Sequence, residues 1–97
     1  MADADLQKLK VGTSLVVVTI IGEPYVTYTK FGYGAVVNCK DIYTGQVYAL
    51  GLSAVSIADP IEKRRLTNNG VLDGLTIGLR RESDDKKAKY IISDVDN

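Results

Sequence analysis

The feature that most constrains this chain is a long run of β-branched residues near its start. Residues 13–22 read TSLVVVTIIG, and the pattern resumes after Pro24 as YVTYTK over residues 25–30. β-Branched and aromatic residues fit the pleated, half-buried surface of a strand. Glycine and proline inside such a run mark either a turn or, as we favour, a bulge within one strand. We therefore expect one long first strand that bends between Gly22 and Pro24.

Shorter strands are expected to follow this long one. In the second, Val37 and Cys39 should point toward the core, with Asn38 and Lys40 on the outer face. In the third, alternation should place Tyr48 on that same outer face. The expected later strands are residues 35–41 (AVVNCKD), 46–51 (QVYALG), 75–81 (LTIGLRR) and 90–95 (YIISDV).

The spacing of apolar residues changes between residues 53 and 70. We expect a single short helix there, which extends about two turns to either side of Asp59. Asp59, Pro60 and Glu62 have the residue types preferred at the N-cap, first and third positions of a helix. Gly70 is a natural stop. These residues therefore form a helix-start signal at Asp59.

Five strands with one short helix between the third and fourth match the plan of an OB-fold barrel. We therefore predict an all-β, five-stranded OB-fold barrel over residues 1–97. The chain has 97 residues, which is enough for one small domain. An SH3-like barrel or a simple sheet with one covering helix is the alternative, although residues 53–70 would be surplus to either.

The charge of the chain is unevenly distributed. Twelve basic side chains balance twelve acidic ones, so the formal net charge is zero. Four of the acids lie near the ends, at Asp3, Asp5, Asp94 and Asp96, which leaves eight acids against twelve bases and a net charge of +4 in residues 6–93. Residues 1–8 and 94–97 are expected to be short, mobile, acidic ends. Zero net charge therefore does not exclude a basic binding surface.

Several kinds of chemistry are excluded by composition. The chain has no His and one Cys, so catalytic triads, imidazole metal sites and thiolate clusters are not expected. Carboxylates such as Glu23, Asp41 and Asp73 have no base or phosphate-binding loop beside them in the sequence. We expect no enzyme activity, no cofactor and no metal. The start of the chain lacks a signal peptide and no run is long enough to span a membrane, so a cytoplasmic location is expected.

Aromatic residues concentrate between residues 25 and 48, and lysines accompany them. Tyrosine and phenylalanine stack on the bases of single strands, while lysine and arginine neutralise phosphates. The competing interpretation is that these tyrosines are half-buried strand residues and that the lysines after residue 85 form a solvated hairpin tip. The candidate nucleic-acid-binding residues are Tyr28, Lys30, Phe31, Tyr33, Asn38, Lys40, Tyr48, Arg80, Lys86 and Lys87.

The stretch from Gly12 to Leu52, with KFGYGAVVNCKDIYTGQVYAL at its centre, resembles the small OB-fold single-stranded DNA-binding proteins of phages and of prokaryotic replication systems. A late KYIISDV strand adds to the pattern. The resemblance implies protection of single strands in replication, recombination or repair. It implies binding roles for Tyr28, Lys30, Phe31, Tyr33, Lys40 and Tyr48. The chain departs from the bacterial type because it has no Trp and no glycine-rich linker to an acidic tip.

Two functions follow as hypotheses. The first is a non-catalytic, largely sequence-independent single-stranded DNA-binding protein, located in the host cytoplasm if viral. RNA as the ligand, a homo-oligomer and contacts with replication proteins stay open, and no membrane partner is expected. The second is a small protein-interaction or viral assembly module without a nucleic-acid role.

Overall fold

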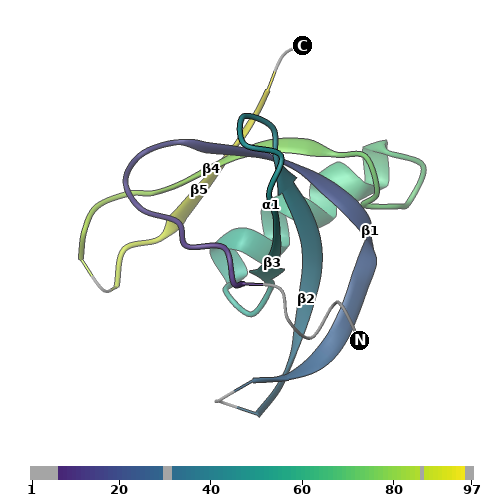
Figure 1. The fold of residues 1–97 in the computed structure, drawn as a ribbon, viewed down its shortest axis with the longest axis horizontal. Coiled ribbons are helices and arrows are strands. Elements are labelled where there is room, and N and C mark those ends of the chain that lie inside the picture. The colour runs from purple at the N-terminus through teal and green to yellow at the C-terminus, as the bar shows by residue number, and fades with distance from the viewer. Residues whose placement is uncertain (1–6, 30–31, 86, 96–97) are drawn as a thin grey trace.

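The computed structural model describes residues 7–29, 32–85 and 87–95. It contains a mostly-β chain with one helix between the third and fourth strands, as predicted (Figure 1). The elements are β1 (Val16–Thr29), β2 (Gly32–Asp41), β3 (Val47–Gly51), α1 (Val55–Thr67), β4 (Thr76–Arg81) and β5 (Tyr90–Asp94).

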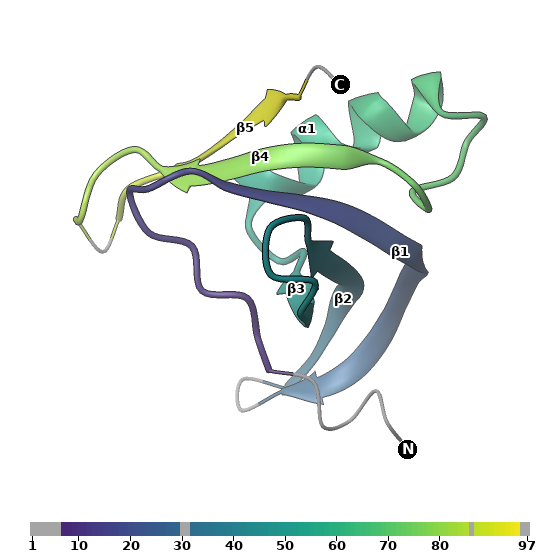
Figure 2. The ribbon, with the colours of Figure 1, turned by 45° about the horizontal axis from the view of Figure 1, so that its top comes forward.

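All five strands belong to one antiparallel sheet in the order β3-β2-β1-β4-β5. The long β1 lies at its centre, pairing with β2 along both of its halves and with β4 along its first half. Among the described residues no ladder joins β3 to β5, so these strands are the two edges of an open sheet. The curl of the sheet nevertheless encloses an apolar interior (Figure 2).

The predicted bend in β1 is confirmed. The register passes from Ile21 opposite Asn38 to Tyr25 opposite Val36, so β1 inserts extra residues into the ladder. Gly22, in this insertion, has a φ of +74°, a conformation that residues with a Cβ rarely adopt. The strand can therefore continue past the bend without losing its pairing with β2.

Two carboxylates tie this bend to the loop that precedes β4. Asp73 accepts a hydrogen bond of 2.6 Å from the backbone N–H of Gly22. In the reverse direction, the Glu23 carboxylate accepts bonds of 3.1 Å from the N–H of Leu72 and 3.0 Å from the N–H of Asp73. The bend is thus held by reciprocal contacts from both sides.

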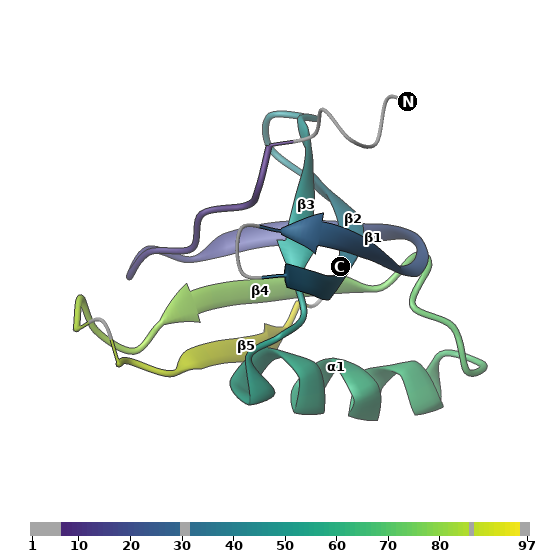
Figure 3. The same ribbon diagram turned by 90° about the horizontal axis from the view of Figure 1, so that it is seen from below.

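The core lies between the inner face of the sheet and α1. Val37 and Cys39 point inward as predicted, as do the apolar positions of β4. α1 runs across the β4–β5 side of the sheet (Figure 3). The central buried cluster consists of Val18, Ile20, Val37, Cys39, Leu50, Ile57, Ile61, Leu72, Ile77 and Leu79.

α1 extends to both sides of Asp59, as predicted, but the helix-start signal at Asp59 does not mark its first residue. The N-cap is Ala54, and Pro60 lies inside the helix. The reason is burial: Ile57 and Ile61, four residues apart, both face the core, so the helix must already have formed before Ile57. Tertiary packing therefore outweighs the local start signal and the hydrogen bond that proline removes.

Residues 7–12, the N-terminal segment, lie along the sheet. The N–H of Leu9 donates to the carbonyl of Ala49 over 2.8 Å, and the N–H of Ala49 donates to the carbonyl of Gln7 over 2.9 Å. Farther along, the carbonyl of Gly12 accepts a 2.7 Å bond from the N–H of Arg81. The segment thus crosses from the β3 edge to β4 (Figure 2).

Candidate nucleic-acid interface

The far ends of β1 and β2, residues 25–29 and 32–35, form a hairpin arm that projects beyond the core (Figure 1). Tyr28 and Tyr33 lie opposite each other in the ladder, with ring centroids 5.1 Å apart and planes tilted by 36°. Their exposed fractions are 67% and 81%. Val26, next along the same face, is 69% exposed. The arm therefore presents an apolar, aromatic surface that packs against nothing in the described part of the chain.

The exposed face of the arm continues the inner face of the sheet. Side chains alternate along a strand, so Tyr33 shares a face with Val37 and Cys39, which are fully buried farther along β2. Opposed residues also share a face, which places Tyr28 there as well. Only the lack of covering structure above the arm makes these rings accessible.

The predicted place of Tyr48 is wrong. It lies opposite Cys39 in the β2–β3 ladder and packs against the core, so it is not beside Asn38 and Lys40. The cause is the register of β3, in which Leu50 is buried and Ala49 takes the position opposite Asn38. Tyr48 is therefore half-buried on the inner side, under the N-terminal segment.

Asn38 and Lys40 lie on the outer face of β2, opposite to the face that carries Tyr33. The Asn38 side-chain oxygen accepts a 2.7 Å hydrogen bond from the hydroxyl of Tyr25. Lys40 is exposed, opposite Thr19 of β1. The structure thus separates these two candidates from the tyrosine pair.

The remaining candidates are dispersed. Arg80, opposite Ile91, lies on the outer face of β4. Lys87 is exposed in the β4–β5 loop, where its backbone N–H donates to Asp85 over 2.9 Å. Lys30, Phe31 and Lys86 lie outside the described residues. Of the ten candidates, the ladder brings Tyr28 and Tyr33 together in direct contact.

The N-terminal segment adds two cations that sequence reasoning missed, Lys8 and Lys10. Both line a groove of about 590 Å³, together with Tyr48, Val16 and Asp41 from the sheet. Among the described residues, no carboxylate is within ion-pair distance of either lysine. The signal was present in the alternation of residues 8–11, KLKV, because Leu9 and Val11, which alternate with the two lysines, pack against the core.

The basic run on α1 is partly neutralised by its own neighbours. The guanidinium of Arg65 bonds Glu62 over 2.9 Å, and this hydrogen bond lowers the pKa of the Glu62 carboxyl and raises that of Arg65. Arg64 bonds Asp94 of β5 over 2.8 Å. These arginines therefore offer less charge to a partner than Lys8 and Lys10 do.

The described residues contain no group of three or more His, Cys, Asp or Glu side chains placed to hold a metal ion. No helix in the described part of the chain is long and apolar enough to cross a membrane. Comparisons with protein families, curated proteins and solved structures find no match. The function has to be argued from this geometry alone.

Proposed function

We propose that this protein binds single-stranded DNA without catalysis and largely independently of sequence. The observation that carries the proposal is the exposed pair of Tyr28 and Tyr33 on the arm. Burying an aromatic ring is favourable, and two rings that touch each other yet stay mostly in water have a face left for another flat group. A nucleobase is such a group, since every base has a π-face.

Cations elsewhere on the surface support the same proposal. Lys8 and Lys10 line the groove under the N-terminal segment, and Lys87 stands in the β4–β5 loop. Each lysine that meets a phosphate releases counterions, so the affinity should fall as salt rises. The tyrosines would supply stacking and the lysines would follow the backbone, which requires no fixed base sequence.

The strand order agrees with an OB-fold, which we propose as the finer description of this sheet. An OB barrel cut between its third and fifth strands would give the order β3-β2-β1-β4-β5. The arm then corresponds to the loop between strands 1 and 2, and residues 82–89 to the loop between strands 4 and 5. OB-folds bind oligonucleotides with these two loops. Protection of single strands during replication, recombination or repair, in a cytoplasm, is the corresponding role.

The test is fluorescence anisotropy of labelled oligo-dT of about twelve nucleotides, within the site sizes of OB-folds. Tyr28→Ala and Tyr33→Ala should each weaken binding by about 5-fold or more, the effect of losing one stacked base. Tyr43→Ala is the matched control, because Tyr43 is 80% exposed in the β2–β3 turn and should not alter the affinity. Absence of binding by the folded protein at low salt would exclude the function.

A protein-interaction or assembly module is the second candidate, and the outer face of β1 favours it. Ile21 is 41% exposed there, and Leu15 precedes the strand at 55%. Ile42, which is 44% exposed, donates its backbone N–H to the carbonyl of Val17 in the same strand. Exposed apolar side chains on one face are typical of a protein contact. Light scattering with and without the oligonucleotide separates the two functions: a mass that rises with protein concentration alone favours the module.

A further inference from the structure

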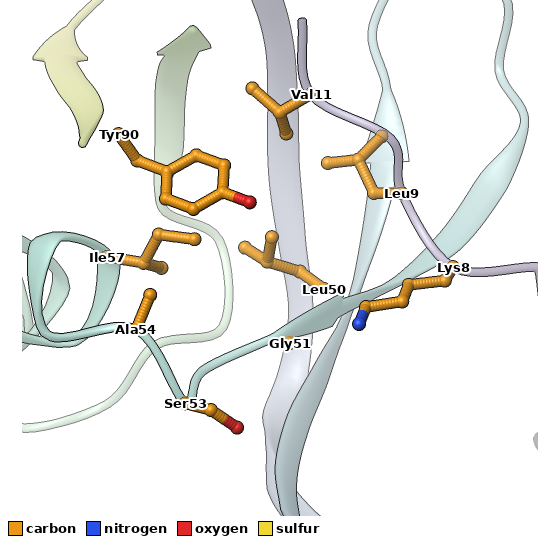
Figure 4. A pocket seen from close by; sticks show the side chains of 9 residues that line it. All are labelled: Lys8, Leu9, Val11, Leu50, Gly51, Ser53, Ala54, Ile57 and Tyr90. Atoms are coloured by element: carbon orange, nitrogen blue, oxygen red, sulfur yellow. The ribbon is translucent and has the colours of Figure 1, made fainter. Parts of the chain in front are cut away.

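A cavity of about 160 Å³ opens between the N-terminal segment, the end of β3, the start of α1 and the start of β5 (Figure 4). It lies between β3 and β5, the two edge strands, which do not pair with each other in the described part of the chain. Its lining is part apolar and part polar, and no Asp or Glu belongs to it. The lining residues are Lys8, Leu9, Val11, Leu50, Gly51, Ser53, Ala54, Ile57 and Tyr90.

Two of these residues place polar atoms where a ligand would meet them. The ring of Tyr90 points its hydroxyl into the cavity, toward Leu50 and Val11 (Figure 4). The side chain of Lys8 runs beside Gly51 at the rim (Figure 4). Neither the Tyr90 hydroxyl nor the Lys8 ammonium has a hydrogen-bond or ion-pair partner among the described residues. The cavity thus combines apolar side chains with the hydroxyls of Tyr90 and Ser53 and one cation.

Size restricts what the cavity can take. An apolar cavity of about 150 Å³ holds one benzene molecule, which is a single six-membered ring. A pyrimidine has one such ring, whereas a purine adds a fused five-membered ring and is therefore a poorer match to this volume. Both cytosine and thymine carry a carbonyl oxygen at position 2, which the Tyr90 hydroxyl could bond.

We propose that this cavity binds one pyrimidine base of the single strand in preference to a purine, with Lys8 on the adjoining phosphate. The inference rests on the proposed function and adds a base preference at one position of an otherwise sequence-tolerant contact. The position of Lys8 supports this inference, because Lys8 lines both this cavity and the groove under the N-terminal segment. A strand that follows that groove therefore passes the mouth of the cavity.

The experiment compares the affinities of oligo-dT and oligo-dA for the wild type and for Ala54→Leu, which fills the cavity. Adenines stack on one another in the free strand, but this effect belongs to the ligand and cancels when the dT-to-dA affinity ratios of two proteins are compared. The ratio should fall by about 5-fold or more in Ala54→Leu, the effect of losing one bound base. Ala58→Leu, in the same helix but outside the cavity lining, should keep the wild-type ratio.

A second pair of variants keeps the test valid if Ala54→Leu does not fold. Gly51→Ala adds a methyl group into the cavity wall, 3.5 Å from the nearest atom of Lys8, an ordinary contact, and should lower the same ratio. Lys8→Met should reduce the slope of log affinity against log salt by about 0.7, the value for one phosphate contact on a single strand. Lys63→Met, an exposed lysine on α1, should leave that slope unchanged.

The outcomes separate this inference from the proposed function. If oligo-dT binding depends on Tyr28 and Tyr33 but the dT-to-dA ratio is the same in every folded variant, the pyrimidine site is wrong and the function stands. If neither oligonucleotide binds at low salt, both fail. A loss of the ratio in the cavity-filling variants alone supports the site.

Discussion

The two halves of β1 have the same alternation of apolar side chains, but these side chains are buried in the first half and exposed in the second. In the first half, Val18 and Ile20 alternate onto the inner face and are 0% and 1% exposed. In the second half, beyond the bend, Val26 and Tyr28 occupy the same face and are 69% and 67% exposed. The first half therefore contributes side chains to the core, whereas the apolar side chains of the second half stay exposed.

This difference shows that an apolar pattern identifies the residues that share one strand face. It does not show whether another element packs on that face. The arm is held by its ladder with β2 and by the reciprocal contacts at the bend. Its side chains add little to folding, so they can be changed without unfolding the protein. Substitutions in the two regions should consequently separate stability from binding.

The largest effect is expected in the core. Ile77→Ala, at a fully buried position of β4, should lower the free energy of unfolding by about 2–5 kcal/mol, because it removes buried methylene groups and leaves a cavity. Val26→Ala on the arm should change it by less than about 0.5 kcal/mol. Urea denaturation followed by circular dichroism measures both. Equal losses would show that the arm is covered in solution.

A pH effect of intermediate size is expected from the thiol of Cys39. Burial, assisted by the charge of Asp41, raises its pKa from 9.0 to about 11. The folded state therefore keeps the proton longer than the unfolded state, so this contribution is complete below pH 9 and is lost as the pH rises to about 11. At 1.36 kcal/mol per pH unit, the loss is at most about 2.7 kcal/mol.

Cys39→Ala provides the comparison, because it removes the thiol and leaves every other side chain of the protein in place. The wild type should lose stability more steeply than the variant between pH 9 and 11. Below pH 9 the thiol of the folded wild type should also react slowly with a disulfide reagent, since the thiolate is the reactive form. Parallel pH profiles of the two proteins would contradict the burial of this group.

Next in size is the carboxylate that holds the bend. Glu23→Ala should cost about 1–2 kcal/mol, because the N–H groups of Leu72 and Asp73 lose a charged acceptor. Glu62→Ala, at an exposed ion pair on α1, should cost less than Glu23→Ala, because solvent screens an exposed pair. Thermal unfolding compares them. A smaller loss for Glu23 than for Glu62 would mean that the bend does not depend on this contact.

Much of the fold could be predicted from the sequence because its signals are local. The β-branched run, interrupted by glycine and proline, predicted the bent β1, and the alternation in residues 75–81 predicted β4. The helix-start signal at Asp59 does not mark the first residue of α1 because capping preferences are weaker than the burial of Ile57 and Ile61.

The candidate site was less predictable, because it depends on faces and on chain segments that meet only after folding. The VYALG sequence of β3 is apolar at alternate and intervening positions alike, so its phase is set by the ladder with β2 and not by its own pattern. For this reason Tyr48 lies on the inner face of the sheet and not on the outer face that the sequence predicted. Lys8 looked like part of an acidic end, and its position depends on a hydrogen-bonded contact with Ala49, far away in the sequence.

The smallest expected effect is the coupling between the two tyrosines of the arm. In a double-mutant cycle, Tyr28→Ala and Tyr33→Ala should show a coupling of about 0.2–1 kcal/mol in unfolding, the range for an exposed cross-strand pair. The same substitutions should weaken oligo-dT binding by a much larger factor than this coupling implies. A coupling well above 1 kcal/mol would mean that the rings serve mainly to hold the arm together. A small coupling with a large loss of binding would mean that the arm is stabilised by its backbone and that its tyrosines are available to the ligand.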